Sequence, residues 1–299
     1  MNGYCQEKHL PTKWSPTENV RWTTPLPGPG NSTPIIWGDR IFMTQALDKG
    51  KERAVICFER KTGNKLWQRA IPYAEKETTH ETNPYCSASP VTDGERVIAS
   101  HGSAGVVCYD FEGKELWRRD LGKFEHVWGN AASPILYGGM VILNCGPGER
   151  TFLLAMDKKT GQDVWKVEEP GGKFGEKNSE WIGSWSTPAV VKVDGRDELI
   201  MTWPEAVKAY DPRTGDLLWT CKGLGKLVYT SPLATPEVVV AISGFHGPFL
   251  ALRPGGRRIR SRRGSDQASS LASMSSSPTK TARCNASSGS LAKRCGSSG

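Results

Sequence analysis

One short pattern occurs four times along the chain, and this repeat restricts the possible folds more than any other feature. In each copy an apolar run ends in a turn with glycine, and a tryptophan follows that glycine by four residues. Successive glycines are 50, 48 and 54 residues apart. A period of this length indicates a repeat architecture, in which each unit packs on its neighbours. The four copies contain Gly63 and Trp67, Gly113 and Trp117, Gly161 and Trp165, and Gly215 and Trp219.

A second marker, a Ser-Pro or Thr-Pro pair, precedes each copy and occurs a fifth time after the last one. A short apolar segment follows each pair, and most copies continue with a turn made of Gly and Asp. Proline at the start of a strand loses no ladder hydrogen bond. Paired Gly and Asp residues supply the positive φ angles of tight hairpins. The pairs are Thr33-Pro34, Ser89-Pro90, Ser133-Pro134, Thr187-Pro188 and Ser231-Pro232.

Each unit therefore predicts four antiparallel strands within about 45 residues. We expect an all-β fold, a β-propeller of four-stranded blades, because no window shows a long helical period. The propeller is expected to be incomplete, with about five blades and a lone closing strand near Trp22. The predicted organisation is an N-terminal extension over residues 1–17, propeller repeats over 18–256 and a Ser/Arg-rich tail over 257–299.

The repeated tryptophans are interpreted as structural. Asp157 and Asp211 can accept hydrogen bonds from the amides that follow them, while the glycine of each turn adopts a left-handed conformation. Each tryptophan is then expected to wedge between neighbouring blades, burying roughly 150–250 Å². Identical rings at identical positions favour a structural role over a catalytic one, and we predict no catalytic residue.

The positive charge of the chain is concentrated in the tail. The formal net charge is +8, and residues 257–299 hold nine of the 39 basic residues but one of the 31 acidic residues. The repeat region is therefore neutral, its charged residues are interpreted as solvated blade edges, and no nucleic-acid partner is expected.

The tail has 13 serines and no aromatic residue, so it is predicted to be disordered. Three alternatives are open for the tail. It is a basic tail that binds anionic surfaces or RNA, a solvated linker or, as we favour, a stretch read out of frame.

The ends and the cysteines give little information about the compartment. Residues 1–20 are polar, so no signal peptide is visible, and no stretch is long enough to span a membrane. The eight cysteines include no Cys-x-x-Cys pair, and no metal site is expected. We expect a monomer.

The candidate binding residues lie in the connections between blades, where propellers carry function. Polar groups beside aromatic rings in these connections could hold a flat ligand or a sugar. The alternative is that the His and Asn side chains only cap the loops by bonding to the backbone. We expect a protein or glycan partner over the channel face. The candidates are His80, Asn83, His126, Asn130, Trp181, Trp185 and His246.

The third and fourth copies share the pattern Ala-x-Asp-x-x-Thr-Gly-x-x-x-Trp, in Ala155–Trp165 and Ala209–Trp219. This pattern resembles the tryptophan-docking motif of the pyrroloquinoline-quinone (PQQ)-like propeller repeats. The first copy matches at Thr62, Gly63 and Trp67, and the second is one residue shorter. The resemblance covers residues 18–256 and implies the fold more specifically than the function.

The family includes PQQ-dependent alcohol and sugar dehydrogenases as well as the BamB-type scaffold of outer-membrane protein assembly. The resemblance implies PQQ and Ca²⁺ for the enzymes, and many of these stack the quinone against vicinal cysteines, which this chain lacks. We therefore expect a non-enzymatic scaffold with no cofactor, with a quinone dehydrogenase as the alternative. The family also implies export to the periplasm, with the signal encoded upstream of Met1.

Overall fold

The computed structural model describes residues 8, 10–172, 177, 180–244 and 246–256, and the backbone of residues 284–286. These residues fold into successive antiparallel sheets, which we call blades 1 to 5 in chain order. Short 3-10 turns, η1 (Asp48–Gly50) and η2 (Gly102–Ala104), connect consecutive strands. The all-β prediction is confirmed.

Blades 1 to 4 each contain four strands that pair in sequence order. Blade 1 is β1 (Ile35–Trp37), β2 (Arg40–Leu47), β3 (Glu52–Glu59) and β4 (Lys65–Pro72). Blade 2 is β5 (Val91–Thr92), β6 (Arg96–Ser100), β7 (Val106–Asp110) and β8 (Glu115–Arg119). Blade 3 is β9 (Ile135–Tyr137), β10 (Met140–Cys145), β11 (Arg150–Asp157) and β12 (Asp163–Pro170). Blade 4 is β14 (Ala189–Val193), β15 (Arg196–Trp203), β16 (Ala206–Tyr210) and β17 (Leu217–Lys222).

Blade 5 contains three strands, β19 (Leu233–Ala234), β20 (Val239–Ile242) and β21 (Phe249–Leu252). A short parallel pair, β13 (Gly183–Ser184) with β18 (Leu227–Val228), ties the connection before blade 4 to the one before blade 5. The segment β22 (Cys284–Ala286) pairs antiparallel with β17. The rest of the predicted tail lies outside the described residues, as do residues 1–7 and 9.

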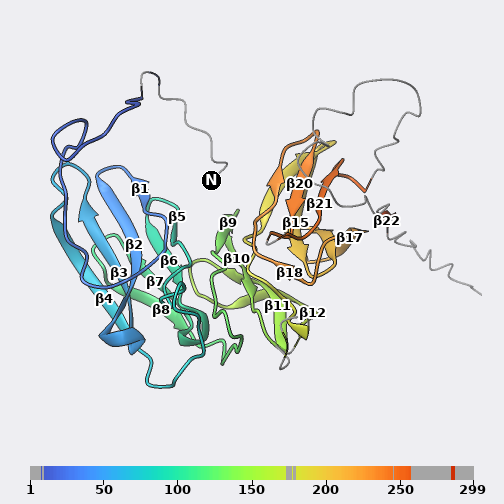
Figure 1. The fold of residues 1–299 in the computed structure, drawn as a ribbon, viewed down its shortest axis with the longest axis horizontal. Helices are drawn as coiled ribbons and strands as arrows, with labels where there is room; N and C mark the ends of the chain where they lie inside the picture. Colours follow the sequence, from blue (N-terminus) through green and yellow to red (C-terminus); the bar gives the residue numbers. More distant parts are fainter. Residues whose placement is uncertain are drawn as a thin grey trace, which may run out of the picture.

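The blades follow one another as an open arc, with blade 1 and blade 5 at opposite ends of the molecule (Figure 1). The core lies between the blades. Phe42, Cys57 and Trp67 on one face of blade 1 pack with Val107 and Tyr109 of blade 2. Equivalent clusters join the later blades. The arc is the incomplete propeller that the repeats predict.

Each repeated tryptophan packs on the glycine turn of the following blade, which confirms the wedge prediction. A Cβ atom added to Gly113 would come 2.8 Å from the ring of Trp67, and one added to Gly161 would come 2.8 Å from Trp117. Gly113 and Gly161 have φ angles of 81° and 72°, in the left-handed region. These positions therefore need glycine for two reasons, the left-handed backbone and the tryptophan ring that packs where a Cβ atom would lie.

The indole N–H groups add a hydrogen bond to each wedge. Trp67, Trp117 and Trp165 donate to the carbonyl oxygens of Phe111, Lys158 and Pro212, at 2.7, 3.0 and 3.1 Å. The junction between blades 4 and 5 differs. There Trp219 donates to the carboxylate of the buried Glu198, at 2.8 Å.

The Ser-Pro and Thr-Pro pairs form a second link between blades that the sequence did not reveal. In blades 1 to 4, the backbone N–H of the Ser or Thr donates to the hydroxyl of its equivalent in the next blade. The pairs are Thr33 to Ser89, Ser89 to Ser133, Ser133 to Thr187 and Thr187 to Ser231, at 2.8, 2.9, 3.0 and 2.9 Å. Four hydrogen bonds from a backbone N–H to a hydroxyl thus connect all five blades just before their first strands, and we call this series the hydroxyl chain.

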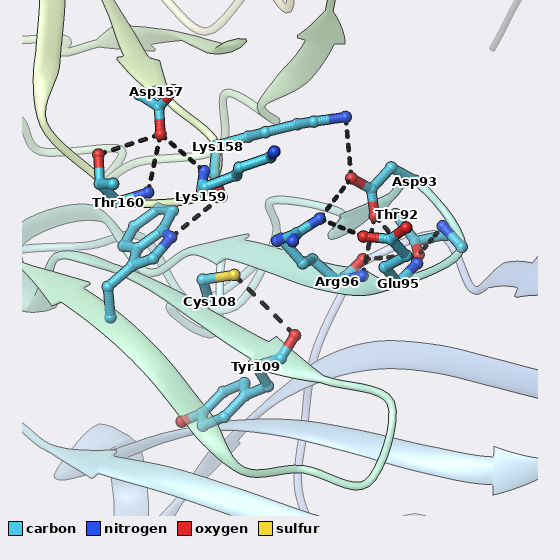
Figure 2. A network of polar contacts seen from close by, with 12 residues as sticks. Thr92, Asp93, Glu95, Arg96, Cys108, Tyr109, Asp157, Lys158, Lys159 and Thr160 are labelled. Carbon is cyan, nitrogen blue, oxygen red and sulfur yellow. Dashed lines mark hydrogen bonds and ion pairs between the residues drawn. The ribbon is translucent and has the colours of Figure 1, made fainter. Parts of the chain in front are cut away.

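An ion-pair network reinforces the junction between blades 2 and 3 (Figure 2). Lys158 of the β11–β12 turn contacts Asp93 of the β5–β6 turn at 2.9 Å, and Arg96 contacts the same carboxylate at 3.3 Å. Burial raises the pKa of Asp93, but hydrogen bonds from Lys158 and from the amides of Glu95 and Arg96 outweigh it and lower the pKa to about 2.

The predicted closing strand near Trp22 is not a strand. Residues 19–22 have no ladder partner among the described residues, so their backbone remains irregular. The side chain of Trp22 nevertheless docks as the repeated tryptophans do. A Cβ atom on Gly63 would come 2.4 Å from its ring, and its N–H donates to the carbonyl of Arg60 at 2.9 Å. The wedge forms without the strand.

Candidate functional site

Four successive connections between blades bring aromatic rings and imidazoles together. They span residues 73–90, 120–134, 171–188 and 223–232, each running from a tryptophan strand to the next Ser-Pro or Thr-Pro pair. We call His80, His126, Trp128, Trp181, Trp185 and Tyr229 the aromatic cluster. The sequence predicted four of these residues, and the structure adds Trp128 and Tyr229.

The rings of the aromatic cluster form a continuous series of contacts. His80 lies 4.3 Å from Trp128, centroid to centroid, and Trp128 meets Trp181 edge to face at 5.8 Å. His126 lies edge to face with Trp185 at 4.8 Å, and Trp185 stacks on Tyr229 at 5.1 Å with 17° between the planes. Trp185 is buried, whereas Trp128, Trp181 and Tyr229 are half-buried. The cluster therefore presents ring surface on a fixed support.

The predicted asparagines hold this support together. Asn83 donates from Nδ2 to the carbonyl oxygens of Trp128 and Asn130, at 2.7 and 3.0 Å, and its Oδ1 accepts from Ser87 at 2.7 Å. Asn130 donates to the carboxylate of Glu77 at 2.7 Å. The side chain of Asn83 thus already has internal partners on both its oxygen and its nitrogen.

The predicted histidines also bond locally. The Nδ1 atom of His126 accepts from the backbone N–H of Trp128 at 3.2 Å, and Nδ1 of His80 lies 2.9 Å from the hydroxyl of Thr82. Burial lowers the pKa of His126 to about 4, so its imidazole is neutral near pH 7. The backbone-bonding role is therefore present at His80, Asn83 and His126, and a ligand-binding role stays a prediction.

His246 lies in the turn between β20 and β21, with a left-handed φ of 62°. The same turn borders the cluster through Gly244, where an added Cβ atom would come 3.1 Å from the ring of Tyr229.

A buried ion pair lies beneath the connections. Arg53 on β3 contacts Glu77 at 3.1 Å, and each side chain is 2% exposed. The guanidinium lies 4.1 Å from the ring centroid of Tyr85, whose hydroxyl donates to the carbonyl of Glu77 at 3.2 Å. Glu77 also accepts from Ser103 at 2.9 Å. The interpretation of charged residues as solvated blade edges is wrong for this pair, because Glu77 faces partners from two blades.

A second buried pair consists of Cys86 and His101. Their Sγ and Nδ1 atoms are 3.9 Å apart. Burial raises the pKa of Cys86 to about 12 and lowers that of His101 to about 3, so both groups are neutral near pH 7. A reactive cysteine needs the thiolate form, which this environment disfavours.

Three side chains in the connections, Glu81, Asn83 and Glu180, could contribute oxygen ligands to the Ca²⁺ site of a quinone enzyme. Within the described ranges, no three His, Cys, Asp or Glu side chains are grouped as metal ligands. Glu81 and Glu180 are exposed, and the amide oxygen of Asn83 is taken by Ser87. These residues do not fit the oxygen-rich site that Ca²⁺ requires. The described part of the chain also has no helix long and apolar enough to cross a bilayer.

Some of the residues that the sequence prediction missed could have been found from a local pattern, and others could not. Trp128 lies between the predicted His126 and Asn130, so the same loop pattern could have identified it. No sequence pattern indicated that Arg53 and Glu77 are buried, since Glu77 follows Glu75 and Lys76 in a charged run typical of a solvated loop. Their pairing depends on the tertiary fold.

Comparison with known proteins identifies the repeats. The family model described as outer membrane protein assembly factor BamB matches residues 12–82 and 51–226. The structure of BamB from Moraxella catarrhalis aligns with a TM-score of 0.52 at 16% identity, over 79% of this chain and 67% of that protein. This likeness concerns the fold.

Two dehydrogenases are also similar. A polyvinylalcohol dehydrogenase from Pseudomonas sp is 23% identical over 238 residues, which are 68% of this chain and 36% of that enzyme. Quinohemoprotein alcohol dehydrogenase from Comamonas testosteroni aligns with a TM-score of 0.48 at 15% identity, over 72% of this chain and 40% of that protein. The chain thus spans well under half the length of either dehydrogenase. The match to the family model covers more than half of the chain, which therefore belongs to the PQQ-like repeat family described as outer membrane protein assembly factor BamB.

Proposed function

We propose that this chain is a non-enzymatic scaffold of the cell envelope that binds a polypeptide over its channel face. Membership in the BamB-described family supports an assembly role. The observation that carries the proposal is the aromatic cluster, in which half-buried rings from four connections meet. Half-buried tryptophan and tyrosine side chains are the residue types that anchor protein interfaces.

A polypeptide suits the cluster better than a glycan does. A sugar ring needs hydrogen-bond partners for its hydroxyl groups beside the aromatic surface. The side chains of Asn83 and Asn130 already bond to carbonyl oxygens and to Glu77. Replacing those bonds would leave buried groups without partners, at a cost of about 1–3 kcal/mol each. Apolar or aromatic side chains of a peptide require no such exchange. Among the described residues of the cluster, the indole N–H of Trp128 is a buried donor with no partner, and one backbone carbonyl of a bound peptide would satisfy it.

The test is a binding titration on the chain as it stands. A fluorescein-labelled peptide with alternating aromatic and polar residues is titrated by fluorescence anisotropy, beside a control peptide with serine at each aromatic position and beside chitotetraose. Saturable binding of the aromatic peptide alone is expected. Binding of chitotetraose alone, or equal binding of both peptides, would contradict the proposal.

A quinone-dependent dehydrogenase is the second candidate, favoured by the similarity to polyvinylalcohol dehydrogenase. It would require PQQ and Ca²⁺, for which Glu81, Asn83 and Glu180 are a poor donor set in this structure. Incubation with PQQ and Ca²⁺ followed by dye-coupled oxidation of polyvinyl alcohol, ethanol or glucose separates the candidates. Turnover above that of free PQQ would favour the enzyme and count against the scaffold.

A further inference from the structure

The Arg53–Glu77 ion pair connects blade 1 to blade 2 and to the connection that follows blade 2. Glu77 lies in the connection after blade 1, and its carboxylate accepts from Asn130 in the connection after blade 2 and from Ser103 in η2 of blade 2. One oxygen, Oε1, receives both bonds, while Oε2 faces Arg53 at 3.1 Å. The carboxylate therefore joins blade 1 to the loop that carries Trp128.

Trp128 is held from both sides of this loop. Asn83, from the same connection as Glu77, binds the carbonyl oxygens of Trp128 and Asn130, while Glu77 binds the amide nitrogen of Asn130. Trp185 adds a bond from its indole N–H to the carbonyl of Gly129, at 2.7 Å. The backbone from residue 128 to residue 130 thus has a fixed position, and the Trp128 ring takes its place between His80 and Trp181 from it.

We infer that Glu77 is a positioning residue for the aromatic cluster, with Arg53 setting the orientation of its carboxylate. The inference rests on the proposed function, because the cluster needs positioning only if it binds a partner. The ring geometry itself can be measured without any partner. Arg53 suits the role because its guanidinium is fixed by the carbonyl of Gly50 at 2.8 Å and by the Tyr85 ring. The flat face of this permanently charged group lies over the Tyr85 ring, and Nη2 at its edge lies 3.1 Å from Oε2 of Glu77.

Substitution of Glu77 by Gln preserves the size of the side chain but removes the charge that faces Arg53. Glu75→Gln is the matched control, because Glu75 is exposed in the same connection. The readout is the near-UV circular dichroism of the folded protein, well below its melting temperature, since closely packed indoles give strong signals there. Each variant is also made with Trp128→Phe.

We expect Glu77→Gln to change the near-UV spectrum, and this change to disappear in the Trp128→Phe background. Glu75→Gln should leave the spectrum as in the wild type. Affinity for the aromatic peptide should fall about tenfold in Glu77→Gln and recover in part in Glu77→Asp, which restores the charge. A lower melting temperature with an unchanged spectrum would show that the pair is only structural and would overturn the inference.

If Glu77→Gln does not fold, Arg53→Lys tests the same positioning role from the other side of the pair. It keeps the positive charge but loses the planar contact with Tyr85 that fixes the group facing Glu77. The two hypotheses fail separately. A Trp128-dependent spectral change without peptide binding in the wild type supports the positioning role and contradicts the proposed function. Peptide binding that Glu77→Gln leaves unchanged, with an unchanged spectrum, contradicts the positioning role alone.

Discussion

At the scale of single residues, the junctions between blades depend on glycines, whose lack of a Cβ atom leaves room for the tryptophan rings. Gly113 has no side chain, and the Trp67 ring occupies the space that a Cβ atom would fill. Gly138 makes a useful contrast, because its φ of 55° is also left-handed but no atom lies within 4 Å of its Cβ position. The two glycines separate backbone strain from the steric demand of the tryptophan.

We predict that Gly113→Ala destabilises the fold by about 3 kcal/mol, the sum of left-handed strain and overpacking. Gly138→Ala should cost about 1 kcal/mol, from strain alone. Urea denaturation followed by tryptophan fluorescence measures both. Equal costs for the two variants would show that the wedge contributes nothing at this junction.

Asp93 gives a pH-dependent contribution at the same scale. Its folded-state pKa of about 2 lies below the unfolded value, so its contribution is complete above pH 4 and is lost as the pH falls from 4 to 2. We predict that Asp93→Asn costs about 1–2 kcal/mol at pH 7 and flattens the decline of the melting temperature between pH 4 and pH 2. An Asp93→Asn variant with the same acid-induced decline as the wild type would refute this assignment.

At the scale of elements, the sequence predicted the strands and missed one of their links. The glycine spacing and the positions of the Ser-Pro and Thr-Pro pairs were enough to predict blades 1 to 4, because the residues of each turn determine its conformation locally. The hydroxyl chain from Thr33 to Ser231 joins residues 44 to 56 positions apart, and no local pattern indicates which group a hydroxyl will meet. At residues 19–22 the sequence predicted a strand that does not form, because this segment has no partner strand among the described residues.

The hydroxyl chain predicts a specific effect at one link. Ser133→Ala removes the acceptor of the Ser89 N–H and should destabilise the fold by about 1–2 kcal/mol. Ser133→Thr keeps a hydroxyl and should stay within about 0.5 kcal/mol of the wild type. Hydrogen exchange at the Ser89 amide provides the local readout. Unchanged protection of that amide in Ser133→Ala would rule the link out.

At the scale of the whole molecule, the aromatic cluster exists because successive blades place successive connections side by side. The sequence could predict which connections carry His80, His126, Trp181 and Trp185, since the repeat identifies the loops. It could not predict their contacts, which depend on Asn83, Arg53 and Glu77 reaching across from other segments. A fold built from equivalent blades thus obtains its distinct surface from the connections that differ.

Replacement of Trp128 by Ala tests the central claim most directly, with Trp14→Ala as the matched control, since Trp14 is 64% exposed and lies outside the cluster. The measurement is the anisotropy titration of the aromatic peptide against both variants and the wild type. We expect a loss of about 2 kcal/mol in binding free energy, roughly thirtyfold in affinity, for Trp128→Ala and no loss for Trp14→Ala. Equal affinity of Trp128→Ala and wild type, with both folded by circular dichroism, would contradict a docking role for the aromatic cluster.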